Sequence, residues 1–189
     1  MITLIFIRHG ATIGNLEKRY IGRTDEPLCD KGISQVLENK KHIPVPDKIF
    51  VSPMLRTRQT AELLFPQMFY TVADGLREAD FGEFEGKTAS ELSENMAYRT
   101  WVDGGCISPI PGGESVAEFK KRCCMTFEKT MESVFDNDTV VFVVHGGVIM
   151  SILEAYAKPA QSFYTYHVEN GECVICEFEK NSNRISVIR

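Results

Sequence analysis

Two short apolar runs constrain the fold of this chain more than any other feature. Residues 2–8 (ITLIFIR) and 139–144 (TVVFVV) are rich in β-branched residues and almost free of polar ones. A run of this length and composition is typical of a strand buried on both faces of a parallel sheet. Segments with helical composition lie between the two runs. We therefore expect strands and helices to alternate along the chain.

The remaining predicted elements continue this alternation. They are helices at 30–42, at 53–65, at 114–135 and after Gly147, and strands at 47–52, 68–73, 172–179 and 184–188. This order predicts an α/β fold, a three-layer sandwich whose mostly parallel central sheet is flanked by helices on both faces. We expect a single domain over residues 1–189. Within it, the glycine-rich residues of about 74–113 are predicted to form a cap of loops and short helices over one end of the sheet.

Charge and hydropathy exclude two classes of partner. The 21 Lys and Arg residues against 26 Asp and Glu residues give a net charge of −5, and no basic run stands out. The chain therefore lacks the broad positive field that non-specific binding of nucleic acid needs. No stretch approaches the roughly 18–20 apolar residues of a membrane span. We expect a cytoplasmic protein that binds neither nucleic acid nor membranes, and the sequence carries no signal of its oligomeric state.

The six cysteines do not predict a metal site. Only Cys173 and Cys176 form a C-x-x-C pair, and both lie in a predicted strand, where an offset of three places side chains on opposite faces. No further Cys or His follows at the spacing of a zinc site. We interpret the cysteines as packing residues in a reducing compartment, and we expect no metal and no cofactor.

The chemistry is expected at two histidines that each follow a buried strand and precede glycine. His9 and His145 stand in matching contexts, R-H-G and V-H-G-G. A buried imidazole costs free energy unless it is satisfied, and ligands of α/β sheets bind outside the carboxyl ends of the strands. His9 and His145 are therefore predicted to share one site. We assign His42 and His167 structural or surface roles.

Two arginines strengthen this prediction. Arg8 lies beside His9, and Arg56 lies near the beginning of a predicted helix, where backbone N–H groups favour negative charge. Guanidinium groups match the oxygens of a phosphate in pairs, so both arginines fit a pocket for a tetrahedral dianion. The alternative is that they pair with carboxylates such as Asp25 or Glu78. From these residues alone, the two interpretations carry equal weight.

A series of six motifs decides between the two interpretations. In chain order they are RHGATIGN (8–15), GRTDEPLCDKG (22–32), SPMLRTRQTA (52–61), LREADFGEFEG (76–86), PGGES (111–115) and VVHGG (143–147). Together they closely resemble the histidine phosphatase superfamily, the group that includes phosphoglycerate mutases. The resemblance covers residues 2 to about 150. Six blocks in the right order are highly specific, whereas R-H-G alone is weak.

The resemblance implies a role for each matching residue. His9 would be the nucleophile that becomes phosphorylated, and Glu78 would be the general acid that protonates the leaving oxygen. The side chains that would hold the transferring phosphoryl group are those of Arg8, Arg56 and His145. The pocket would also use the side chain of Asn15 and the backbone N–H groups of Gly22 and Gly146. The partner would be a small phosphorylated metabolite.

Three functions follow from this resemblance, and a small-molecule phosphatase is favoured. A mutase of this family would carry a basic segment after the acid, but residues 87–115 offer only Lys87 and Arg99 as cations. A module that binds phosphate without catalysis is disfavoured because every catalytic position of the family is occupied. The short chain and the DFGEFEG and PGGES blocks look like the phosphatase branch that contains α-ribazole phosphatase. Broad-specificity and fructose-2,6-bisphosphatase-like enzymes share those blocks, so α-ribazole 5′-phosphate is one candidate substrate among several.

Overall fold

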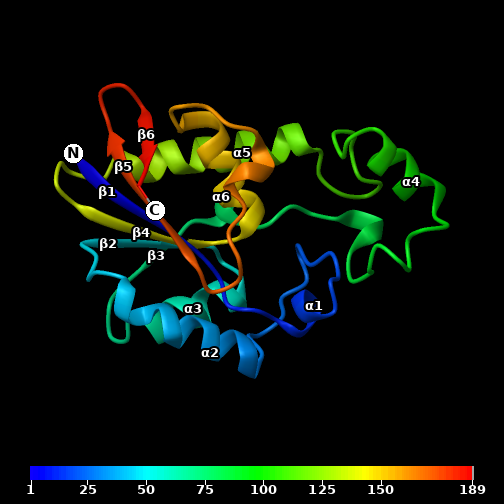
Figure 1. Ribbon diagram of the computed structural model, residues 1–189, viewed down its shortest axis with the longest axis horizontal. Helices are drawn as coiled ribbons and strands as arrows, with labels where there is room; N and C mark the ends of the chain where they lie inside the picture. The colour runs from blue at the N-terminus through cyan, green and yellow to red at the C-terminus, as the bar shows by residue number, and fades with distance from the viewer. Residues whose placement is uncertain (189) are drawn as a thin grey trace.

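A six-stranded sheet in the order β3-β2-β4-β1-β5-β6 forms the centre of the protein in a computed structural model that describes residues 1–188 (Figure 1). The strands are β1 (Ile2–Arg8), β2 (Lys48–Val51), β3 (Thr71–Val72), β4 (Thr139–Val144), β5 (Cys173–Glu179) and β6 (Arg184–Val187). The first four run parallel, whereas β5 pairs antiparallel with both β1 and β6. The predicted α/β sandwich with a mostly parallel sheet is confirmed.

Helices cover both faces of the sheet. Helices α2 (Asp30–Asn39) and α3 (Leu55–Leu64) pack together on one face, and α5 (Val116–Met131) and α6 (Gly146–Tyr156) pack together on the other (Figure 1). Two shorter helices, α1 (Ile13–Leu16) and α4 (Met96–Asp103), lie outside these layers. Helix α5 begins with a capping box, in which the Ser115 and Glu118 side chains each accept a hydrogen bond from the other residue's backbone N–H.

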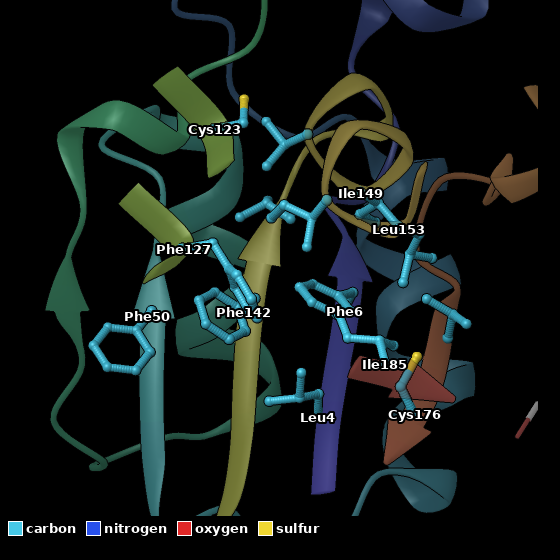
Figure 2. Close-up of a cluster of buried hydrophobic side chains, with 14 of the residues drawn as sticks. Leu4, Phe6, Phe50, Cys123, Phe127, Phe142, Ile149, Leu153, Cys176 and Ile185 are labelled. Atoms are coloured by element: carbon cyan, nitrogen blue, oxygen red, sulfur yellow. The ribbon is translucent and has the colours of Figure 1, made fainter. Parts of the chain in front are cut away.

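The two faces of the sheet carry separate apolar cores. Phe6 of β1 and Phe142 of β4 stack at 5.2 Å between ring centroids and pack under α5 and α6 (Figure 2). Ile5 and Ile7 of β1 point to the other face and pack with the α3 side. This alternation follows from the two-residue period of a strand, and each buried side chain of this size contributes roughly 1.5–3 kcal/mol. The apolar runs therefore anchor both layers.

Cys173 and Cys176 lie on opposite faces of β5, as their spacing predicts. Cys176 belongs to the core under α5 and α6, and Cys173 packs against the other core. In the part of the chain that the structure describes, no group of three or more His, Cys, Asp or Glu residues is placed to hold a metal ion. No helix within residues 1–188 is long and apolar enough to span a bilayer.

Two predicted elements differ from the structure. The strand expected at 68–73 is only Thr71–Val72, because this edge of the sheet is exposed and pairs with β2 over two residues. The helix expected at 114–135 ends earlier, at Met131. Residues 74–113 form irregular turns around α4, with an aromatic cluster of their own that contains Phe84, Tyr98 and Trp101.

Candidate active site

Three neighbouring parallel strands end at the same edge of the sheet, and the residues that follow them form the site. His9 follows β1, His145 follows β4 and Ser52 follows β2. The strands pair in register, with Arg8 opposite Val144 and Val51 opposite Val143. The residues after them therefore lie side by side, as expected at the carboxyl ends of parallel strands. The structure brings the His9 and His145 rings to 5.1 Å between centroids.

His9 is held as a neutral imidazole with one free nitrogen. Its Nδ1 lies 2.7 Å from the carbonyl oxygen of Gly10, which can only accept, so Nδ1 carries the proton. Burial lowers the pKa of His9 well below its ordinary value, and the positive charges of Arg56 and Arg8 lower it further, whereas the hydrogen bond to Gly10 acts in the opposite direction. The lone pair of Nε2 is therefore available as a nucleophile.

His145, the second histidine of the site, is fully buried. Its Nε2 lies 2.8 Å from the Ser52 hydroxyl, whereas its buried Nδ1 has no hydrogen-bond partner in residues 1–188. Burial is the largest cause that lowers the pKa of His145 well below its ordinary value, followed by the charge of Arg56. An orphaned buried nitrogen costs free energy, so its presence beside His9 points to a ligand that completes it.

Arg56 and Arg8 bond to backbone carbonyls and keep other N–H groups unused. Arg56, on α3 and 1% exposed, donates to the carbonyl oxygens of Thr24 at 2.8 Å and Gly22 at 2.9 Å. Arg8 donates to the carbonyl of Val168 at 2.8 Å. The Nε of each arginine is buried without a partner in the described residues. Burial lowers the pKa of both guanidinium groups, and the charge of Glu78 opposes this.

The alternative that Arg8 and Arg56 form ion pairs with carboxylates is not what the structure contains. Within residues 1–188, neither guanidinium lies within 4.0 Å of a carboxylate. Asp25 instead accepts from the N–H of Leu55 at the beginning of α3, at 2.6 Å. A buried and a half-buried guanidinium group without an anion favour the phosphate-pocket interpretation.

Glu78 contacts the first turn of α6, the helix that follows His145. Its Oε2 accepts from the N–H of Gly147 at 3.2 Å, and its Oε1 accepts from the N–H of Ala79 at 3.0 Å. A Cβ on Gly147 would lie 2.4 Å from Glu78 Oε1, so the carboxylate approaches the helix only because residue 147 is glycine. Arg122 of α5 holds the segment before it through the carbonyls of Gly75 and Arg77. We call Arg8, His9, Arg56, Glu78 and His145 the histidine centre.

The sequence of this chain matches one family model over almost its whole length. Residues 4–189 match the family model described as "Histidine phosphatase superfamily (branch 1)". The chain belongs to the histidine phosphatase superfamily, branch 1. The match extends the predicted resemblance, which ended near residue 150, through the last strands of the sheet.

Individual relatives in this superfamily carry different names. The chain is 30% identical to 2,3-bisphosphoglycerate-dependent phosphoglycerate mutase 2 of Gloeobacter violaceus, over 97% of this chain and 88% of the relative. It is 28% identical to adenosylcobalamin/alpha-ribazole phosphatase of Salmonella typhimurium, over 89% and 86%. The structure of phosphoserine phosphatase from Entamoeba histolytica, in complex with 3-phosphoglyceric acid, superposes with a TM-score of 0.83 at 27% identity and covers 100% of this chain and 96% of that one.

The other residues expected in the phosphate pocket of a histidine phosphatase are placed less directly. Gly146 begins α6 and packs against Arg8, with 3.4 Å between an ideal Cβ and Arg8 Nε. Asn15 uses its Oδ1 to accept from the N–H of Thr12 and from Asn170. The N–H of Gly22 is not free, because it donates to Oε1 of Glu85 at 2.7 Å. The role of the Gly22 N–H in a phosphate pocket therefore stays a prediction, and Glu85 would compete for this donor.

Sequence reasoning missed the contribution of the segment before β5. Asn170 donates its side-chain N–H to the carbonyl of His9 at 3.1 Å, and the N–H of Gly171 is shared between the carbonyls of Arg8 and His9. Gly171 has a φ of +80°, a left-handed conformation that glycine adopts without strain. The Asn-Gly pair just ahead of a predicted strand is the signal that could have marked this turn.

A cavity of about 470 Å³ opens beside the histidine centre, and we call it the aromatic cavity. Arg8, Glu78 and Gly146 line one side of it. Most of the other lining residues are aromatic or aliphatic, among them Tyr20, Phe81, Trp101, Phe119, Phe163 and Tyr164. Glu78 also borders a second, polar cavity of about 570 Å³. The predicted acid of the superfamily therefore borders a space large enough for a small organic molecule.

Proposed function

We propose that this chain hydrolyses phosphate monoesters of small cytoplasmic metabolites through a phosphohistidine at His9. The observation that carries the proposal is the state of His9, a neutral imidazole whose protonated Nδ1 is bonded to Gly10 and whose Nε2 is free. Arg8 and Arg56, each with a buried Nε that has no partner in the described residues, lie in the same centre. Phosphoryl transfer depends mainly on positioning and charge neutralisation, and this centre supplies both.

The proposed reaction has two steps. In the first, Nε2 of His9 attacks phosphorus, the ester P–O bond breaks, and Glu78 gives its proton to the departing alkoxide. In the second, water attacks the phosphohistidine, Glu78 takes a proton from that water, and the P–N bond breaks to release inorganic phosphate. The contacts of Glu78 with the N–H groups of Gly147 and Ala79 hold its carboxyl group against the first turn of α6, the helix that follows His145. A general acid of this kind contributes roughly 10²–10⁴-fold in rate.

The aromatic cavity supports a substrate with an aromatic or apolar alcohol. Among its lining residues, the cations are Arg8, which belongs to the histidine centre, and Lys120, which already pairs with Glu154 and lies 4.5 Å from the centroid of the Phe163 ring. A planar leaving group would gain stacking contacts here. α-Ribazole 5′-phosphate has this character, and the likeness to the Salmonella typhimurium relative supports it as one candidate.

Mutase-type phosphoryl transfer is the second candidate, because of the likeness to the Gloeobacter violaceus relative. A phosphoglycerate substrate needs cations for its carboxylate. The arginines that line the polar cavity are Arg23, Arg77 and Arg122, and each pairs with an acidic residue. These pairs leave less positive charge for a second anionic group, so hydrolysis is favoured.

A panel of phosphorylated metabolites tests the proposal. We expect release of inorganic phosphate from esters of aromatic or apolar alcohols, with an acid-labile label on the wild-type protein after brief reaction with radiolabelled substrate. Conversion of 3-phosphoglycerate to its 2-isomer without phosphate release would favour the mutase. Phosphate binding without turnover of any ester would indicate a binding module and overturn the proposal.

A further inference from the structure

Two charged side chains, those of Arg56 and Glu85, hold the loop of residues 22–24 through hydrogen bonds to its backbone. On one side, Arg56 donates to the carbonyls of Gly22 and Thr24 at 2.9 and 2.8 Å. On the other, a single oxygen of Glu85, Oε1, accepts from the N–H groups of the same two residues, at 2.7 and 2.9 Å. The loop therefore links a carboxylate to a guanidinium group of the histidine centre.

Glu85 has a fixed position from which to hold this loop. It follows a short 3₁₀ turn, Gly82–Phe84, and the next residue, Gly86, donates its N–H to the carbonyl of Tyr20 at 2.8 Å. Tyr20 in turn donates its N–H to the carbonyl of Lys87 at 2.9 Å. These two hydrogen bonds join the backbone just after Glu85 to the backbone just before the 22–24 loop. The Glu85 carboxylate therefore has little freedom to follow a shifted loop.

The loop also packs tightly against the segment that carries Glu78. A Cβ on Gly22 would lie 1.8 Å from the carbonyl oxygen of Ala79, so any shift of Gly22 in that direction is blocked. Release of its N–H from Glu85 would free the loop to move the other way, and its carbonyls would move with it. Since Arg56 is buried and its guanidinium group donates to those carbonyls, the guanidinium plane would follow the loop.

We propose that Glu85 is a positioning residue that orients Arg56 through the 22–24 loop, with no contact of its own with the reacting atoms. A guanidinium group has five N–H donors in a rigid fork. In Arg56, one N–H on each Nη donates to the loop. The Nε–H and the other two Nη–H groups are left for phosphoryl oxygens. This inference rests on the proposed function, which makes Arg56 a phosphate ligand.

Three single variants separate this role from general stability. Glu85→Ala removes the acceptor, Glu85→Gln keeps an oxygen that can accept from both N–H groups, and Glu83→Gln changes an exposed carboxylate two residues away. We expect Glu85→Ala to lower kcat/KM on p-nitrophenyl phosphate and the affinity for inorganic phosphate by about 10²-fold. Glu85→Gln should recover most of this loss, and Glu83→Gln should behave as wild type.

A double-mutant cycle with Arg56→Lys supplies the decisive readout. Lysine lacks the fork that the loop orients, so in the Arg56→Lys background a Glu85 substitution should cost much less than in wild type. A merely structural role would give independent losses in the two backgrounds, and that result would overturn the inference. If Glu85→Ala does not fold, the same cycle is measured with Glu85→Gln, whose smaller loss should also vanish beside Arg56→Lys.

Calorimetry with inorganic phosphate keeps the two proposals distinguishable, because it needs no turnover. A wild-type protein that binds phosphate but hydrolyses no ester refutes the proposed function. The double-mutant cycle of Glu85 and Arg56 can still be measured in that case, from the dissociation constants of the variants for phosphate. Wild-type phosphate affinity in Glu85→Ala refutes the inference and leaves the proposed function standing.

Discussion

The histidine centre and the aromatic cavity are built in different ways. The centre takes its histidines from the ends of adjacent buried strands, and hydrogen bonds to the backbone hold His9 and Arg56. The cavity is lined largely by side chains of irregular segments and of the cap, and Tyr164 and Ile107 on its wall are mostly exposed. A rigid centre suits a reaction that depends on positioning, whereas a loosely built wall allows substrate preference to vary.

Replacement of the predicted nucleophile, His9, should lower turnover more than any other change. A smaller loss would contradict the view that the reaction depends on the rigid histidine centre. His9→Ala is expected to abolish turnover and phosphoenzyme formation, because no other group in the centre offers a free Nε2. The fold should persist, which circular dichroism checks. Labelled phosphoenzyme in His9→Ala would move the nucleophile to His145 or elsewhere.

Replacement of the predicted acid should have the next largest effect, and one that depends on the leaving group. Glu78→Gln should slow hydrolysis of an alkyl phosphate by roughly 10²–10⁴-fold, because an alkoxide leaves poorly without a proton. The first turnover on p-nitrophenyl phosphate should lose less, since its phenolate departs with little protonation. Hydrolysis of the phosphohistidine would then limit the rate, and a burst should precede slow turnover. Equal losses on both substrates, or a selective loss in Glu83→Gln, would place the acid elsewhere.

The buried imidazoles of the centre should also appear in the pH dependence of stability. The pKa of both His9 and His145 is lowered by burial, so the folded protein stays neutral there while the unfolded chain takes up protons below about pH 6.5. Stability should therefore fall on acidification below that pH, by up to about 1.4 kcal/mol per pH unit for each histidine. Urea unfolding at a series of pH values measures this, and the free energy of unfolding should fall less steeply on acidification in His145→Gln than in wild type.

The smallest effect is expected at the wall of the aromatic cavity. Tyr164 lines the cavity but is 69% exposed, so Tyr164→Ala should fold normally. Loss of one aromatic contact should raise KM for 1-naphthyl phosphate roughly 2–10-fold and leave KM for glycerol 3-phosphate unchanged. Phe69→Ala, a change at a 99% exposed ring that does not line the cavity, is the matched control. Equal changes on both substrates would show that the cavity does not select the leaving group.

The same contrast explains what could be predicted from the sequence. The residues at 2–8 and 139–144 are almost all apolar, so their burial, their parallel pairing and the meeting of His9 with His145 follow from composition and strand geometry. The cap has no such period, and its aromatic residues are close in space only because turns at residues such as Gly82 and Gly86 fold them together. The hydrogen bond from the Gly22 N–H to Glu85 joins residues that are 63 apart in the sequence. Its donor is a backbone group that every residue except proline has, so no side-chain pattern indicates the contact.

The position of the Asn170–Gly171 turn has a consequence for how the protein is made. His9 is translated before the groups that bond its carbonyl, which lie 161 and 162 residues further along the chain. Strand β1 also lacks its β5 neighbour until those residues have been translated. A nascent chain cut short before the turn would contain every residue of the histidine centre and still lack the bonds that align the nucleophile. Nascent polypeptides should therefore remain inactive until Asn170 and Gly171 have been translated.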